Sequence, residues 1–259
     1  MNHTAQEYLS LPVPMRKRHL IDLSKDGRFE PAEGVDQEYH TTWRLARALD
    51  TFLVDFINDR IQSFVDFNNK EKRVSLVEES ALASFNKILQ SLHTDGNSFK
   101  SRVKTSPKNI YELGGALKLA FGNNATRSIS TSLGLVWENI ASISPQAVSP
   151  EIHFGVKLKG IDIIVLDDER LIYTQLKTQK NTLTGSQRGR SVNELVLHDH
   201  RQIVACFDTH ASWTFNSKLV PRVCGKQFWE SIGFQYSEII DMLKKAMKML
   251  DEEYIKLLE

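Results

Sequence analysis

The sequence predicts a mixed α/β fold, in which helices flank one mixed sheet, on three observations. Apolar residues recur at steps of three and four through much of the first half of the chain, which is typical of amphipathic helices. Two strand-like segments, the first rich in Ile and Val, follow Pro150 and are joined by a polar turn, which indicates a β-hairpin. A helical periodicity then returns over residues 236–258. Helices, a strand-rich region and a closing helix together predict a sheet covered by helices.

The first half of the chain is expected to begin without regular structure and then to form short helices. Residues 1–35 contain Pro12, Pro14 and Pro31 and are expected to be irregular. Helical patterns follow, with a polar break at residues 95–97 and with Gly122 as the C-cap of the last helix. The expected helices cover residues 36–68, 76–92 and 110–121.

The second half carries the strand signals. An amphipathic helix is expected over residues 126–143, ahead of them. The expected strands cover residues 160–166, 171–178, 202–207 and 212–215. We therefore divide the chain into an N-terminal arm and helical region, residues 1–125, and a core that includes the C-terminal helix, residues 126–259.

Composition restricts the class of protein without naming a partner. The 259 residues fit one large domain or one domain with a helical annex. The formal net charge is +1, so a nucleic-acid site must come from local clustering of positive charge. No stretch approaches the length of a membrane span, and the N-terminus lacks a basic segment followed by an apolar run. We expect a cytoplasmic protein with no membrane partner.

The hairpin places three polar side chains on one face. Residues two apart on a strand share a face, so Gln175 and Lys177 point the same way. If Leu166 pairs with Leu171 across the turn, Asp162 lies opposite Gln175 on that same face. Burying an unpaired carboxylate or ammonium is costly, so the cluster needs an explanation. One explanation is an Asp162–Lys177 ion pair at a solvated sheet edge, and the other is a catalytic site.

The same hairpin resembles the core motif of the PD-(D/E)XK nucleases, in particular type II restriction endonucleases. In that family an Asp on one strand is followed, on the next strand, by an acid, any residue and Lys. Here Ile161-Asp162 precedes Gln175-Leu176-Lys177. Ile161 stands where the family often has Pro, and Gln175 stands at the acid position, as in some restriction enzymes. The resemblance covers about residues 126–232 and implies a restriction-endonuclease-like core behind an N-terminal helical region.

The resemblance also implies a metal and a role for each residue. Phosphodiester cleavage needs a hard cation to activate water and to stabilise charge, and Mg²⁺ prefers oxygen ligands. Asp162, Gln175 and the backbone carbonyl of Leu176 would bind Mg²⁺, and Lys177 would orient or deprotonate the attacking water. Because Gln175 is neutral, we expect weaker metal affinity than with an acid there. Glu138 is either an accessory catalytic residue, as on the helix ahead of the family's core, or a solvated helix residue.

A basic polar segment follows Lys177. Residues 178–190 contain three positive side chains and no acid, so they form either a flexible solvated loop or a DNA-contacting segment. Their direct continuation from Lys177 favours contact with DNA. The residues expected to touch phosphates or base edges are Lys180, Asn181, Thr182, Thr184, Ser186, Gln187, Arg188 and Arg190.

The function implied by the resemblance is that of a type II restriction endonuclease. Such an enzyme hydrolyses double-stranded DNA at a specific palindromic site with Mg²⁺, beside a cognate DNA methyltransferase in the same system. One candidate site per chain and two strands to cut predict a homodimer. Two alternatives remain: another nuclease of this fold, acting in repair or on modified DNA, and a catalytically inactive DNA-binding protein, which Gln175 favours.

Overall fold

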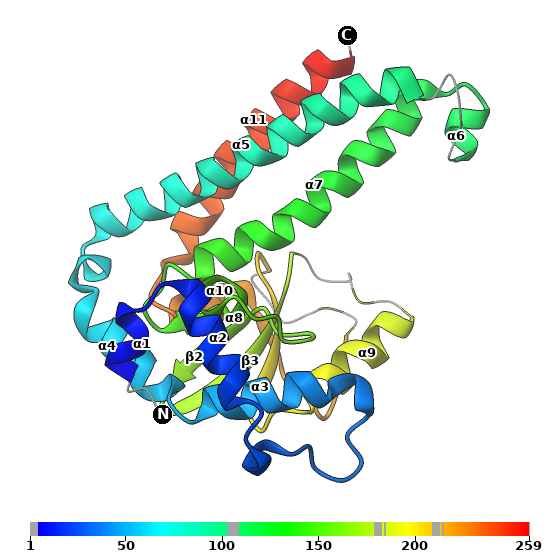
Figure 1. Cartoon of the computed structure of the whole chain (residues 1–259). Helices are drawn as coiled ribbons and strands as arrows, with labels where there is room; N and C mark the ends of the chain where they lie inside the picture. The colour runs from blue at the N-terminus through cyan, green and yellow to red at the C-terminus, as the bar shows by residue number, and fades with distance from the viewer. Residues whose placement is uncertain are drawn as a thin grey trace.

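A five-stranded mixed sheet forms the centre of the fold, and helices cover both of its faces (Figure 1). The computed structural model describes residues 5–102, 109–178, 183, 185–208, 213 and 215–258, with the backbone alone for 95–102 and 257–258. The predicted α/β class, with one mixed sheet flanked by helices, is confirmed. None of the described helices is long and apolar enough to cross a membrane.

The sheet combines an antiparallel and a parallel half. Its strands, in spatial order, are β1 (Ala147–Val148), β2 (Ile163–Asp167), β3 (Arg170–Lys177), β4 (Arg201–Ala205) and β5 (Arg222–Cys224). β1, β2 and β3 pair antiparallel, whereas β3, β4 and β5 pair parallel. A parallel pair needs a crossover connection, and helix α9 (Ser186–Leu195) lies on the connection between β3 and β4. β3 is therefore the central strand and not a sheet edge.

The hairpin has the predicted register. Leu166 pairs with Leu171, and the N–H of Asp162 donates to the carbonyl of Thr174 at 3.0 Å. Asp168 and Glu169 both have positive φ, at 45° and 63°, as a two-residue turn requires if it is to match the twist of its strands. The register continues to the residue before β2, so Asp162 lies across from the last residues of β3.

The first face of the sheet is covered by the N-terminal helices and α8 (Pro150–Phe154). These helices are α1 (Ala5–Ser10), α2 (Val13–Leu23), α3 (His40–Asp50) and α4 (Leu53–Ser63), with 3₁₀ turns η1 (Gly27–Phe29) and η2 (Gln37–Tyr39). The expectation that residues 1–35 are irregular is wrong. Pro12 and Pro14 lie at the start of α2, where proline is tolerated, and Tyr8 and Leu20 are buried.

The second face is covered by long helices that extend past the sheet as an arm (Figure 1). The elements on this side are η3 (Val65–Asn68), α5 (Lys70–Arg102), α6 (Ile110–Leu113), α7 (Leu117–Ala141), α10 (Gly225–Ser231) and α11 (Tyr236–Leu258). The C-terminal helix is confirmed over its predicted range. Phe228 and Trp229 of α10 are buried in the apolar cluster of this face.

Two predicted helix ends are wrong because packing overrides local sequence. α5 continues through residues 95–97, where a break was expected. α7 continues through Gly122, which was expected to be a C-cap. A Cβ atom on Gly122 would lie only 2.8 Å from the hydroxyl oxygen of Tyr254, and the Tyr254 ring stacks on Phe121. Gly122 thus leaves room for the Tyr254 hydroxyl of α11 and does not mark the end of the helix.

Both faces use residues from the two halves of the chain. The position between residues 125 and 126 lies inside α7, and each apolar cluster contains residues from before and after it. Arg60 of α4 joins the two sides, since its guanidinium donates to the carbonyls of Ala147, Ser142 and Ser144. Of the strand expected over residues 212–215, positions 212 and 214 lie outside the described residues, and Trp213 and Phe215 are not in a strand.

Candidate active site

A cavity of about 310 Å³ lies where α7, the start of β2 and the end of β3 meet. It collects every residue that the sequence analysis expected to catalyse or to bind metal, although these residues come from three separate elements. The lining includes Glu138, Asp162, Gln175, Leu176 and Lys177. The hairpin register brings the last four together, and α7 adds Glu138.

Asp162 is held at the start of β2 by the backbone of β3. Its Oδ2 accepts a hydrogen bond from the Leu176 N–H at 2.7 Å. Burial raises the pKa of the Asp162 carboxyl, although the Leu176 N–H and the positive charges of Lys177 and Lys157 act in the opposite direction. A carboxylate that is costly to bury and only partly compensated is suited to bind a cation.

Gln175 and Lys177 face the cavity from β3. Gln175 is 6 % exposed, and its Oε1 has no hydrogen-bond partner among the described residues. Burial lowers the pKa of the half-buried Lys177, while Asp162 and Glu194 favour its charged form. No ion pair within 4.0 Å joins the described side chains of Asp162 and Lys177. Together with the central position of β3, this contradicts an ion pair at a solvated edge.

Glu138 is part of the cavity and not a solvated helix residue. It lies near the C-terminal end of α7, and the Ser149 hydroxyl donates to its Oε1 while also accepting from the Ile152 N–H at the start of α8. Burial, more than the neighbouring charge of Asp162, raises the pKa of Glu138 to about 7, against the lowering effect of the Ser149 hydrogen bond. Glu138 therefore changes charge near neutral pH.

The raised pKa of Glu138 predicts a pH-dependent loss of stability. In the unfolded chain Glu138 ionises near its ordinary value of 4.5, whereas in the folded protein it ionises at about 7. Protonated Glu138 therefore contributes to the free energy of unfolding in full below pH 4.5, the pKa in the unfolded chain. This contribution is lost as the pH rises through about 7, the pKa in the folded protein. With allowance for solvent screening, we expect wild type to lose about 1–2 kcal/mol relative to Glu138→Gln between about pH 4 and pH 8.

Urea unfolding of both proteins across this pH range measures the difference. Other titrating groups are common to the two proteins and cancel in the comparison. A difference that stays constant with pH would show that Glu138 ionises in the folded protein as it does in the unfolded chain.

The basic polar segment is partly helical. Lys180, Asn181, Thr182 and Thr184 lie outside the described residues. The other four expected DNA contacts, Ser186, Gln187, Arg188 and Arg190, are exposed on the first turns of α9, so this part is not the flexible loop considered above. The Arg188 guanidinium donates to the Asn216 carbonyl, and Arg190 forms an ion pair with Glu194 at 2.8 Å. These side chains follow β3 directly and lie on the helix that packs against it.

Three charged residues near the site were not predicted. Lys157 and Glu151 are exposed and line the cavity, and Lys157 precedes Asp162 on the same loop, a closeness in sequence that could have indicated it. Glu194 is buried on α9, beside Gly160. No local pattern marks Glu194, because only the crossover from β3 to β4 brings α9 to this position.

The donor set fits a hard divalent cation. The described residues contain no cluster of three or more His, Cys, Asp and Glu side chains in a metal-binding arrangement. The cavity instead offers the carboxylates of Asp162 and Glu138 together with the buried, unpaired amide oxygen of Gln175. Oxygen donors of this mixed kind suit Mg²⁺, which keeps several water ligands.

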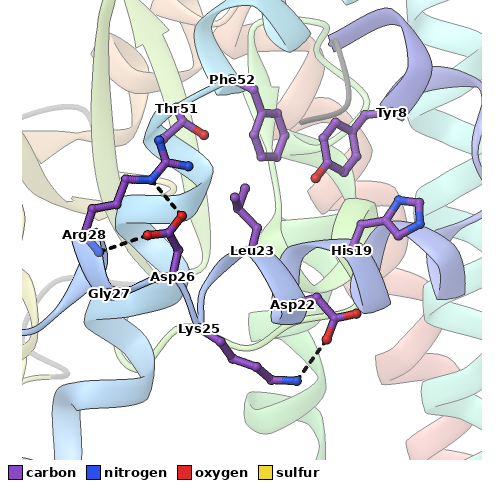
Figure 2. Close-up of a pocket in the computed structure, with 10 residues that line it drawn as sticks. All are labelled: Tyr8, His19, Asp22, Leu23, Lys25, Asp26, Gly27, Arg28, Thr51 and Phe52. Carbon is purple, nitrogen blue, oxygen red and sulfur yellow. Dashed lines mark hydrogen bonds and ion pairs between the residues drawn. The ribbon is translucent and has the colours of Figure 1, made fainter. Parts of the chain in front are cut away.

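A larger cavity, of about 710 Å³, lies among the N-terminal helices (Figure 2). The stacked rings of Tyr8 and Phe52, 4.2 Å apart, line it together with two ion pairs. The ion pairs join Lys25 to Asp22 and Arg28 to Asp26. None of the residues singled out in the sequence analysis as catalytic, metal-binding or DNA-binding lines this larger cavity.

The chain has no significant match to a protein-family model, to a curated protein or to a solved structure.

Proposed function

We propose that this chain is a Mg²⁺-dependent endonuclease of the PD-(D/E)XK type that hydrolyses double-stranded DNA. The observation that carries the proposal is the meeting of Asp162, Gln175, Lys177 and Glu138 in one cavity, where the Gln175 Oε1 is buried without a partner. A buried polar group without a partner costs free energy, and a bound ion is one of the explanations for such a group. The arrangement suits a cation and a phosphate better than it suits a stable core.

Each residue has a distinct part in the proposed mechanism. Asp162, the Gln175 Oε1 and the Leu176 carbonyl would hold Mg²⁺, which activates water and stabilises charge on the scissile phosphate. Glu138, whose pKa near 7 allows it to carry or release a proton, lies beside this ligand set. Lys177, whose pKa is lowered by burial, orients the attacking water and offsets the negative charge that develops on the phosphate. Lys157 at the mouth of the cavity meets an incoming backbone phosphate.

Within this class we favour a type II restriction endonuclease with a palindromic target and a cognate DNA methyltransferase. The exposed side chains at the start of α9 are candidates for reading or positioning the duplex. Incubation of the protein with plasmid DNA and Mg²⁺ tests the proposal. Discrete bands support a restriction enzyme, a smear indicates a nuclease without a fixed target, and uncut plasmid indicates a DNA-binding protein in which Gln175 marks lost activity.

Gln175 gives a prediction about metal requirement. If its Oε1 binds the cation, Gln175→Ala should need roughly tenfold more Mg²⁺ for half-maximal cleavage, because a buried ligand is lost. Gln175→Glu adds a negative charge at the same position and should lower the required Mg²⁺. Cleavage rates measured over a Mg²⁺ titration decide this. An Ala variant with the titration curve of wild type would leave Gln175 a purely structural residue.

We also propose that the protein acts as a homodimer, since each chain has one candidate site and a duplex has two strands. The C-terminal helix α11 uses one apolar face within the chain, because Leu250 is buried in the second-face cluster and Leu243 and Met247 pack against it. Sedimentation equilibrium with and without duplex DNA should give twice the monomer mass of 29.6 kDa. Double-strand breaks made in one binding event by a protein that stays monomeric would contradict the dimer.

A further inference from the structure

Glu194 is a buried carboxylate with one exposed cationic partner. Its side chain is 5 % exposed, and its Oε1 accepts a hydrogen bond from the Nε of Arg190, one turn earlier on α9, at 2.8 Å. Burying a carboxylate is costly unless it is paired. The proposed mechanism does not use Glu194, so its position within the fold needs another reason.

Arg190 has donors to spare on its exposed side. Its side chain is 72 % exposed, and among the described residues its terminal Nη nitrogens donate no hydrogen bond. Besides Glu194, Tyr39 and Glu38 act electrostatically on Arg190, and Glu38 is itself paired with Lys159 at 3.1 Å. A guanidinium presents five donors in a planar fork, so Arg190 can keep Glu194 on Nε while its Nη nitrogens bind a phosphate.

Glu194 also contacts the turn that carries Asp162. Gly160 has φ +73°, and a Cβ atom there would lie 2.4 Å from the Glu194 Oε2, so the turn and α9 meet without room for a side chain. Gly160 precedes Asp162 by two residues. The charge of Glu194 acts on both Asp162 and Lys177, so the carboxylate lies within electrostatic range of the candidate site.

We propose that Glu194 is a positioning residue, which aims Arg190 at a DNA backbone phosphate and ties that contact, through Gly160, to the turn that holds Asp162. The inference rests on the proposed function, since it assigns the ligand of Arg190 as a phosphate of the duplex that the site cleaves. Arg190 is the residue that meets the phosphate, and Glu194 acts on the duplex through Arg190 and Gly160 without contacting it.

The sign of one substitution separates this role from simple electrostatics. Removing an acid near bound DNA ordinarily strengthens binding, because repulsion of the phosphates is relieved. If Glu194 orients Arg190, Glu194→Gln should instead weaken binding of a duplex by roughly threefold to tenfold and lower its salt slope by about one. Arg190→Ala should do the same, and the double variant should be no weaker than either single one, since both remove one shared contact.

Fluorescence anisotropy of a labelled target duplex, titrated with the full chain at several salt concentrations in EDTA, measures these effects without cleavage. Arg190→Lys is a second variant, which should fold normally because this side chain is exposed. It keeps the positive charge but lacks the planar fork of guanidinium donors. It should therefore weaken binding as Glu194→Gln does. Lys245→Gln removes another exposed, paired cation, one that contacts Glu78 on the far helices, and should bind like wild type.

The outcomes are distinct. Weakened, non-additive binding in the Glu194 and Arg190 variants supports the inference, even if wild type binds DNA without cutting it and the nuclease proposal fails. Unchanged or tighter binding by Glu194→Gln, additive losses in the double variant, or wild-type binding by Arg190→Lys overturns the inference while leaving cleavage by Asp162 and Lys177 untouched. A wild type that binds no duplex overturns both.

Discussion

Asp162→Asn is expected to abolish DNA cleavage, by roughly a thousandfold or more, while the protein stays folded and still binds the duplex. The substitution preserves the shape of the side chain. It also keeps an oxygen that can accept the hydrogen bond that the Leu176 N–H donates to Asp162 in wild type, at 2.7 Å. It removes the negative charge with which Asp162 is proposed to bind the cation. Single-turnover cleavage at saturating Mg²⁺, with anisotropy in EDTA, separates loss of chemistry from loss of binding. Asp162→Ala should be equally inactive.

The stability of this variant has an expected direction. Burial raises the pKa of Asp162 in the folded protein, so ionising Asp162 destabilises the fold. The free energy of unfolding of wild type therefore falls as the pH rises above the ordinary pKa of an Asp. Asn carries no such cost, so Asp162→Asn should unfold at a higher temperature than wild type at alkaline pH. Asp167→Asn, an exposed acid at the other end of β2, is the matched control and should cut like wild type. Near-native cleavage by Asp162→Asn would remove Asp162 from the site.

Lys177→Met is expected to lower the cleavage rate by roughly a hundredfold to a thousandfold, with a smaller effect on affinity for the duplex. Met retains the apolar stem of the side chain and loses the ammonium that faces the phosphate. Burial lowers the pKa of Lys177, so its charge destabilises the folded protein as the pH falls through the folded pKa, and the Met variant should be at least as stable at neutral pH. The loss would therefore be one of chemistry, measured as the single-turnover rate.

Lys157→Met provides the comparison for Lys177. Both side chains line the cavity, but Lys157 is exposed at its mouth. Its loss should weaken binding and lower the salt slope by about one, with little change in the saturated rate. If the two variants lose rate equally, then general positive charge, and not the position of Lys177, supports cleavage.

Local patterns predicted the elements that depend on local sequence. The hairpin register follows from alternation and a short turn, and the C-terminal helix follows from a long apolar period, so both were predicted correctly. The errors have different causes. Gly122 has the sequence of a helix end, but α7 runs through it and the Tyr254 hydroxyl of α11 lies beside it. Pro12 and Pro14 lie at the start of α2, where proline is tolerated, so they do not prevent a helix.

The residues of the candidate site also fall into those that local sequence predicts and those that only tertiary packing brings together. Asp162, Gln175 and Lys177 were predictable because one hairpin carries them, and their places opposite one another need only the register. The placement of Glu138 in the cavity required the packing of α7, and no pattern in the sequence states that. Glu194 was missed because its relation to Asp162 exists only once the chain has crossed from β3 to β4.

Residues from both halves of the chain cover each face of the sheet, and this limits how the protein can be divided into fragments for expression. A fragment of residues 126–259 would begin inside α7 and would lack α5, which packs along α7 in the whole chain and shares its apolar cluster. It would also lose the helices that cover Ile164 and Tyr173 on the other face. Such a fragment presents two bare apolar surfaces and is expected to aggregate during expression. Segmental labelling, split reporters and crystallisation trials should therefore place their cuts outside the sheet and its two coverings.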